Sequence, residues 1–196
     1  MDIQTIATYN ALAQAYDNET VDFWARFPAD FVDEFAGRVS GKVLNVGSGP
    51  GRDSVLLRNR EIDVTCFDAS EAMIALTQAQ GFRSVLGDFE SMLFADGEFG
   101  GVWAYTSLLH MPKFRIDVAM NEIRRVLKDG GVFAIGMREG DFDGYRPSSE
   151  IDAPRWFSFY SKTELEEILV RNGFEIVHFA EYTPGTKNYL NFIVQK

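Results

Sequence analysis

The sequence contains little of what several classes of protein depend on. Its single cysteine, Cys66, and two histidines, His110 and His178, allow no internal disulfide and predict no Cys/His metal site. Acidic residues outnumber basic ones by 29 to 19, and the net charge of −10 disfavours nucleic-acid binding. No apolar run approaches the roughly 20 residues of a membrane span, and the polar, acidic start is unlike a secretory signal. We therefore expect a cytoplasmic protein with no metal, nucleic acid or membrane partner.

The sequence does contain enough apolar material for one domain, because 46% of its 196 residues are hydrophobic. Residues 1–40 have helical spacing and many aromatics, which predicts an N-terminal helical cap on a single domain covering 1–196. Strands and helices alternate through the core, 41–196. Strands are expected at 43–46, 62–67, 84–86, 102–105, 132–137, 174–180 and 190–194, with helices between most of them.

Helix-end signals support this division of the core. Asp68 with Glu71, and Ser161 with Glu164, have capping-box spacing, and Gly130-Gly131 is expected to stop a helix that carries one apolar face over 116–127. Alternation of strands and helices predicts an α/β fold with a doubly wound parallel sheet and helices on both faces. The last two strands have no helix between them, so they should form an antiparallel hairpin.

A glycine-rich turn, VLNVGSGPGRDS at residues 43–54, follows the first strand of the core. Ligands of doubly wound sheets bind beyond the carboxyl ends of the strands, where Gly47, Gly49 and Gly51 lie. Asp68 ends the second strand about 20 residues later, where an acid can bind ribose hydroxyls, cap the next helix, or do both. The G-x-G-x-G spacing differs from the dinucleotide fingerprint G-x-G-x-x-G, and no P-loop motif is present.

Five segments in order resemble motifs of the class I S-adenosylmethionine (SAM)-dependent methyltransferases, over nearly the whole chain. The resemblance implies a seven-stranded, mostly parallel sheet of order 3-2-1-4-5-7-6 with strand 7 antiparallel. It also implies SAM as cofactor and S-adenosylhomocysteine as product. The segments are VLNVGSGPG, VTCFDASEAMI, LGDFESMLFADGEFGGVWAYTSLLHMP, LKDGGVFAI and RWFSFYSKTELEEILVRNGFEIV.

The resemblance also assigns cofactor contacts residue by residue. Asp68 would hold the ribose hydroxyls, Asp88 would accept from the adenine amino group, and Tyr105 would border the methionine and the methyl. The methionine part of SAM would be wrapped by Gly47, Ser48, Gly49 and Gly51, and the adenosine would lie beside Ala69, Met73 and Phe89. For Met73 and Phe89, ordinary core packing is the alternative.

Three residues depart from the family pattern. Asn45 stands two residues before Gly47, where the family usually has an acid that helps to hold the cofactor's ammonium group. An asparagine can still accept a hydrogen bond, but without charge the bond is weaker by about 1 kcal/mol. Gly100 replaces an aspartate and Asp129 replaces a proline, and both changes look structural.

Methyl transfer mostly requires positioning and exclusion of water, so a general base is needed only if the acceptor must lose a proton. His110 is the candidate base, or else a residue that fixes its loop, and Tyr105 could orient an acceptor. Residues 138–160 form the expected substrate-site loop. Candidates for acceptor binding are Tyr16, Trp24, Arg138, Tyr145 and Trp156; the alternatives are helix packing for the aromatics and a solvated loop for the arginine.

These observations favour a SAM-dependent methyltransferase acting on a small-molecule acceptor, as a monomer or homodimer. A non-catalytic SAM-binding or partner-binding protein that has kept the fold is the alternative, motivated by Asn45 and by the open question of a base. A nicotinamide-dependent oxidoreductase is disfavoured by the glycine spacing. The identity of the acceptor is left open.

Overall fold

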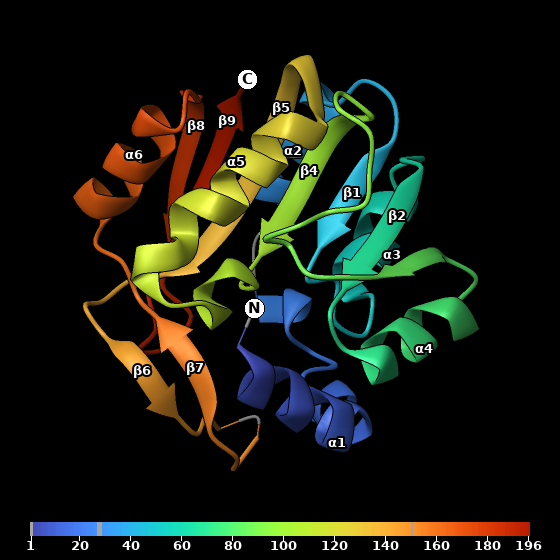
Figure 1. The fold of residues 1–196 in the computed structure, drawn as a ribbon, viewed down its shortest axis with the longest axis vertical. Helices are drawn as coiled ribbons and strands as arrows, with labels where there is room; N and C mark the ends of the chain where they lie inside the picture. Colours follow the sequence, from blue (N-terminus) through green and yellow to red (C-terminus); the bar gives the residue numbers. More distant parts are fainter. Residues whose placement is uncertain (1, 27–28, 150) are drawn as a thin grey trace.

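The computed structural model describes residues 2–26, 29–149 and 151–196, which contain a seven-stranded sheet of order β3-β2-β1-β4-β5-β9-β8 (Figure 1). All neighbouring strands are parallel except β9, which is antiparallel to both β5 and β8. The predicted order is therefore confirmed, with β8 and β9 as the sixth and seventh strands. The strands are β1 (Val43–Val46), β2 (Val64–Asp68), β3 (Arg83–Leu86), β4 (Phe99–Tyr105), β5 (Leu127–Arg138), β8 (Glu175–Tyr182) and β9 (Tyr189–Gln195).

Helices cover both faces of this sheet, as predicted. Buried side chains of α5 and α6 pack in one apolar cluster, and those of α2 and α3 pack in a second cluster. The helix α1 lies beyond the carboxyl ends of the central strands and packs on α4 (Figure 1). The helices are α1 (Ile3–Glu19), α2 (Asp30–Arg38), α3 (Arg52–Arg58), α4 (Glu71–Ala79), α5 (Ile116–Val126) and α6 (Lys162–Arg171). Pro28, expected to separate two helices of the cap, lies outside the described residues.

Two helix ends differ from the prediction. Ser70, not Asp68, is the N-cap of α4, because Asp68 is the last residue of β2 and its carboxylate serves the glycine turn instead. Helix α5 ends at Val126, and the Gly130-Gly131 pair lies inside β5, which begins at Leu127. The capping box of Ser161 and Glu164 at the start of α6 is confirmed.

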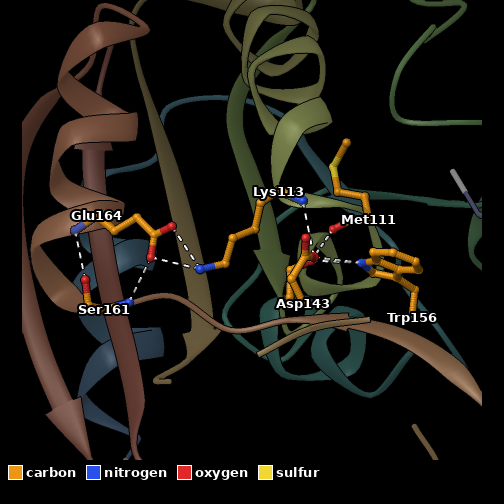
Figure 2. A network of polar contacts seen from close by, with 7 residues as sticks. Met111, Lys113, Asp143, Trp156, Ser161 and Glu164 are labelled. Carbon is orange, nitrogen blue, oxygen red and sulfur yellow. Dashed lines mark hydrogen bonds and ion pairs between the residues drawn. The ribbon is translucent and has the colours of Figure 1, made fainter. Parts of the chain in front are cut away.

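The segment 138–160, expected as a loop, contains a small two-stranded sheet formed by β6 (Asp143–Arg146) and β7 (Arg155–Ser158). Figure 2 shows how it is fastened to the core. The Asp143 carboxylate accepts from Trp156 Nε1 at 3.0 Å and lies 2.6 Å from the Ser158 hydroxyl. Nearby, Lys113 donates to Glu164 on α6 at 2.9 Å. The Asp143 contacts lie within the hairpin, and Lys113 N joins it to the segment after β4 by donating to the Asp143 carboxylate at 3.4 Å.

Two short 3₁₀ segments after β4 place residues near this hairpin: Leu108–His110 and Lys113–Arg115. A third, Trp24–Arg26, follows α1. Within the described ranges, none of the helices carries an apolar stretch long enough to cross a bilayer.

The structure shows what surrounds the two other residues that depart from the family pattern, Asp129 and Gly100. Asp129 forms an ion pair with Lys196 at 3.4 Å on the surface. Gly100 lies where the β4 backbone passes the chain before β1, and a Cβ at this position would lie 1.7 Å from the carbonyl oxygen of Ser40. Only glycine fits there without a shift of backbone.

We expect Gly100→Ala to lower the free energy of unfolding by about 3 kcal/mol or more, the upper range for overpacking, because backbone cannot move aside like a side chain. Gly37→Ala is the matched control: Gly37 lies in α2, and a methyl group added there would have nothing within 4 Å, so this change should stabilise by about 1 kcal/mol. Urea unfolding of both variants measures the difference. Equal stabilities would contradict the close approach of Gly100 to Ser40.

Candidate functional site

A pocket lies at the carboxyl edge of the sheet, where β1, β2 and β4 end. The strand order reverses between β1 and β4, which is where doubly wound sheets bind ligands. The pocket is partly open to solvent. Its wall consists of Tyr9, Tyr16, Thr20, Phe23, Gly47, Ser48, Gly49, Pro50, Arg52, Asp53, Asp68, Ala69, Met73, Phe89, Tyr105, Thr106, Ser107 and His110.

The glycine turn forms one side of this wall. Gly47 has a φ of 67°, and a Cβ there would lie 2.3 Å from the Cβ of Ser107, so the turn packs tightly on the segment after β4. Gly47 and Ser48 both donate their N–H groups to the Phe67 carbonyl, at 2.7 and 3.1 Å, which ties the turn to β2. Gly51, predicted to wrap the ligand, lies outside the wall. Its φ of 93° starts α3, and its backbone faces Thr77 of α4.

Asp68 lies at the β2 side of the pocket with its carboxylate held by backbone. One oxygen accepts from Gly49 N at 2.8 Å, and the other accepts from Ser70 N at 2.9 Å. Burial raises the pKa of Asp68, and the two backbone donors oppose that effect. Ala69, Met73 and Phe89 line the same side, so this end combines a fixed acceptor with an apolar wall.

Besides Gly51, two further predicted cofactor contacts lie outside the wall. Asp88 caps a local turn, where its Oδ1 accepts from Glu90 N at 3.0 Å, and its contact with adenine stays a prediction. Asn45 is 1% exposed, and its Nδ2 donates to Ser54 Oγ at 2.9 Å beneath the turn. Its side chain therefore faces the interior of the domain and makes no part of the pocket surface.

Sequence reasoning missed Asp53, which the structure places in the wall. Its Oδ1 accepts from Trp24 Nε1 at 2.6 Å, and its Oδ2 accepts from Trp103 Nε1 at 2.8 Å. Burial raises the pKa of Asp53 to about 6, against the lowering effect of both indole donors. The only sequence signal for Asp53 was its position just after the glycine turn. Its hydrogen-bond partners, Trp24 and Trp103, lie far from it in the chain.

Tyr105, at the end of β4, lines the pocket and is 5% exposed, and its contact with the methionine and methyl of SAM stays a prediction. Its ring stacks on Trp103 with centroids 5.8 Å apart. Burial raises the pKa of Tyr105 well above its ordinary value, so its hydroxyl is a neutral group at physiological pH. It can orient a ligand by hydrogen bonding.

His110 lines the pocket, but both of its ring nitrogens are engaged. Nδ1 lies 2.7 Å from the carbonyl oxygen of Trp156, which can only accept, so Nδ1 carries the proton. Nε2 is then the acceptor for the Tyr9 hydroxyl at 2.8 Å, and Tyr9 in turn accepts from Arg155. Burial, with the Arg155 charge in second place, lowers the pKa of His110 to about 3. His110 joins the cap, the β4 loop and β7, which is the role of fixing the loop rather than that of a free base.

The cap contributes directly to the pocket, through Tyr9, Tyr16 and Thr20. Arg52 binds its end by donating to the Thr20 hydroxyl at 2.6 Å and by pairing with Asp17. Further along α1, Asn10 accepts from Ser70 Oγ at 2.7 Å. The helix is therefore fastened to both α3 and α4 across the site.

Of the predicted acceptor-binding residues, Tyr16 alone is part of the wall described above. Trp24 uses its N–H on Asp53 and lines a separate hollow with Phe31 and His178. The other three side chains are engaged elsewhere, in or beside the hairpin. Arg138 stacks on Phe159 at 4.4 Å, Tyr145 is 44% exposed and donates to Asp2, and Trp156 donates to Asp143. Across the described ranges, no three His, Cys, Asp or Glu side chains converge where they could hold a metal ion.

We expect the His110 imidazole to remain neutral, with the proton on Nδ1, from pH 5 to pH 8, because its pKa is lowered to about 3. Nitrogen-15 NMR of a His178→Gln variant, in which His110 is the sole histidine, measures this directly. An inflection near pH 6.5, the usual value for histidine, would contradict the network drawn here.

The known proteins to which the chain is similar include methyltransferases. The sequence model of a family described as a methyltransferase domain matches residues 44–135. The O-methyltransferase resE of Aspergillus sclerotiorum is 28% identical over 169 residues, which cover 79% of this chain and 62% of that protein. The chain thus spans less than two thirds of that relative.

Two solved structures share the fold. The complex of DhpI with S-adenosylhomocysteine superposes with a TM-score of 0.79 at 23% identity, covering 97% of this chain and 94% of that one. The Burkholderia thailandensis 1,6-didemethyltoxoflavin N1-methyltransferase, with bound S-adenosylhomocysteine, has a TM-score of 0.73 at 23% identity, covering 97% and 87%. At these identities the likeness is one of fold.

The motifs in their order, the strand order of the sheet and the match to a methyltransferase-domain family agree with one another. Together with the named relatives and structures, they support a class I SAM-dependent methyltransferase.

Proposed function

We propose that this chain binds SAM in the pocket at the ends of β1, β2 and β4 and transfers its methyl group to a small-molecule acceptor. The observation that carries the proposal is the Asp68 carboxylate, held by Gly49 N and Ser70 N on the wall beside the glycine turn. A fixed carboxylate next to an apolar wall suits a ribose attached to a flat base. The protein would act in the cytoplasm as a monomer or homodimer.

The residues of the chain have distinct tasks in this proposal. Asp68 accepts from the ribose hydroxyls, while Met73 and Phe89 supply apolar surface beside the base. SAM, when bound, supplies a methyl group that its sulfonium charge has already activated. The cap residues Tyr9 and Tyr16 exclude water from that end of the pocket, and Tyr105 orients the acceptor.

The acceptor is proposed to be small because the cap and the β6–β7 hairpin lie beside the site. Thr5 on α1 accepts from Trp156 N of β7 at 2.9 Å, which joins the two elements. The names of two similar proteins support this class, since one is an O-methyltransferase and the other acts on 1,6-didemethyltoxoflavin. They differ in the atom that is methylated, so the acceptor atom is left open.

A non-catalytic SAM-binding protein is the second candidate. The inward-facing Asn45 and the engaged, neutral His110 favour it, because neither supplies a charge or a free base to the pocket. The two candidate functions both include SAM binding and differ only in methyl transfer. Binding and transfer therefore need separate experiments.

We expect Asp68→Ala to weaken S-adenosylhomocysteine binding by about tenfold or more, since hydrogen bonds to a charged acceptor contribute roughly 1.5–3 kcal/mol. Isothermal titration calorimetry measures the dissociation constants. Asp63→Ala is the control: Asp63 is exposed and directly precedes the other end of β2, so affinity should stay within about twofold. A wild-type protein that binds neither SAM nor S-adenosylhomocysteine would refute the proposal.

Turnover is tested with SAM labelled in its methyl group and a cell extract separated by size. We expect label in the small-molecule fraction with wild-type protein and much less with Asp68→Ala, because the variant holds the donor poorly. Label confined to the macromolecular fraction would contradict a small acceptor. Binding of SAM without any transfer would favour the non-catalytic candidate.

A further inference from the structure

We propose that Asp53 is the residue that binds the ammonium group of SAM, at the end of the pocket opposite the ribose-binding Asp68. The inference rests on the proposed function, because it names a contact of the same cofactor. Asp53 is one of two aspartates in the pocket wall, and its position was not expected from the resemblance.

The carboxylate of Asp53 is held in one orientation. Trp24 belongs to the segment after α1, and Trp103 belongs to β4, so the two donors approach from separate elements. Their indole N–H groups lie 2.6 and 2.8 Å from the two oxygens. An indole N–H can only donate, so the buried Trp103 and the half-buried Trp24 both direct a donor at this place. Each carboxylate oxygen keeps a second lone pair for a ligand.

The charge of Asp53 lacks an equal partner in this arrangement. Both of its hydrogen-bond donors are neutral, and its neighbour Arg52 is itself paired with Asp17 and Thr20. Burial raises the pKa of Asp53 to about 6, because the enclosed carboxylate loses water that would stabilise its charge. A ligand that brings a positive charge to the carboxylate would offset this loss.

Asp53 also lies on the correct side for the amino-acid end of the cofactor. It contacts Trp103 of β4, whereas Asp68 ends β2, and these strands flank β1 on opposite sides. The ribose hydroxyls of SAM lie near the middle of the molecule and the ammonium at one end. A pocket with one carboxylate on each side of β1 matches that separation.

The neighbouring charges leave Asp53 available to a cationic group. Arg52 and Asp53 are adjacent, and both line the pocket. Because Arg52 is already paired with Asp17, Asp53 is the charge here that a ligand's ammonium group can meet. Asn45, by contrast, lies outside the pocket wall and donates through its Nδ2 to Ser54 within the domain.

The test is a double-mutant cycle between Asp53 and the ammonium group, read by calorimetric dissociation constants. The ligands are S-adenosylhomocysteine and its desamino analogue, which keeps the carboxylate but lacks the amino group. The proteins are wild type, Asp53→Asn, and Asp22→Asn as a control that removes one negative charge from an exposed site near the cap. Thermal unfolding of each variant accompanies the titrations.

We expect wild type and Asp22→Asn to prefer S-adenosylhomocysteine over the desamino analogue by about tenfold or more, the range for a charged hydrogen bond. Asp53→Asn should bind the analogue as wild type does and should lose most of the preference. That pattern supports the inference, because it locates the loss at the ammonium group.

Two outcomes would overturn it. One is an Asp53→Asn protein that keeps the full preference for the amino group. The other is a wild type that binds both ligands equally, a result that does not depend on the variant folding. In either case S-adenosylhomocysteine still binds, so the proposed function stands. Failure of wild type to bind either ligand would instead refute the proposed function itself.

Discussion

The carboxylate of Asp68 joins the parts of the molecule on which the site depends. By accepting from Gly49 N and Ser70 N, it connects the turn after β1 with the start of α4. Ser70 then caps α4 and donates to Asn10 on α1, so the cap is positioned through the same chain of hydrogen bonds. Without this acceptor, two backbone N–H groups at the pocket edge would lose their partner, at a cost of about 1–3 kcal/mol each.

A second set of contacts closes the pocket from the other side. His110, Tyr9 and Arg155 come from the β4 loop, α1 and β7, and they form a chain of donors and acceptors in which each role is determined. The Arg155 side chain is 2% exposed and lies 5.0 Å from the centre of the Tyr9 ring. A neutral histidine suits this position, since a protonated ring would stand beside a buried guanidinium.

The two aspartates of the pocket, Asp53 and Asp68, are in surroundings that disfavour their ionised form. Both are surrounded by protein atoms that raise their pKa values, and both are held by donors that carry no full charge. For Asp53, a folded-state pKa near 6 lies above the unfolded value, so its ionisation opposes folding as the pH rises through that range. A domain tolerates such a group when a ligand makes use of it.

The residues themselves determined the order of the elements and predicted a ligand site at the glycine turn, because these follow from local periodicity and from that turn, whereas the strand order came from the family resemblance. The resemblance then supplied the family and the chemical identity of the cofactor. Contacts within one helical turn, such as the capping box of Ser161 and Glu164, could also be predicted from the spacing of the residues.

The tertiary structure alone decided which polar side chains face the pocket. Asp53 and Asn45 lie on either side of the glycines in sequence, yet one lines the pocket and the other faces Ser54. The hydrogen bonds of Asp53 to Trp24 and Trp103, and of His110 to Tyr9 and Trp156, join residues separated by 29 or more positions. Such pairings depend on how distant elements pack, and no local pattern of residues encodes them.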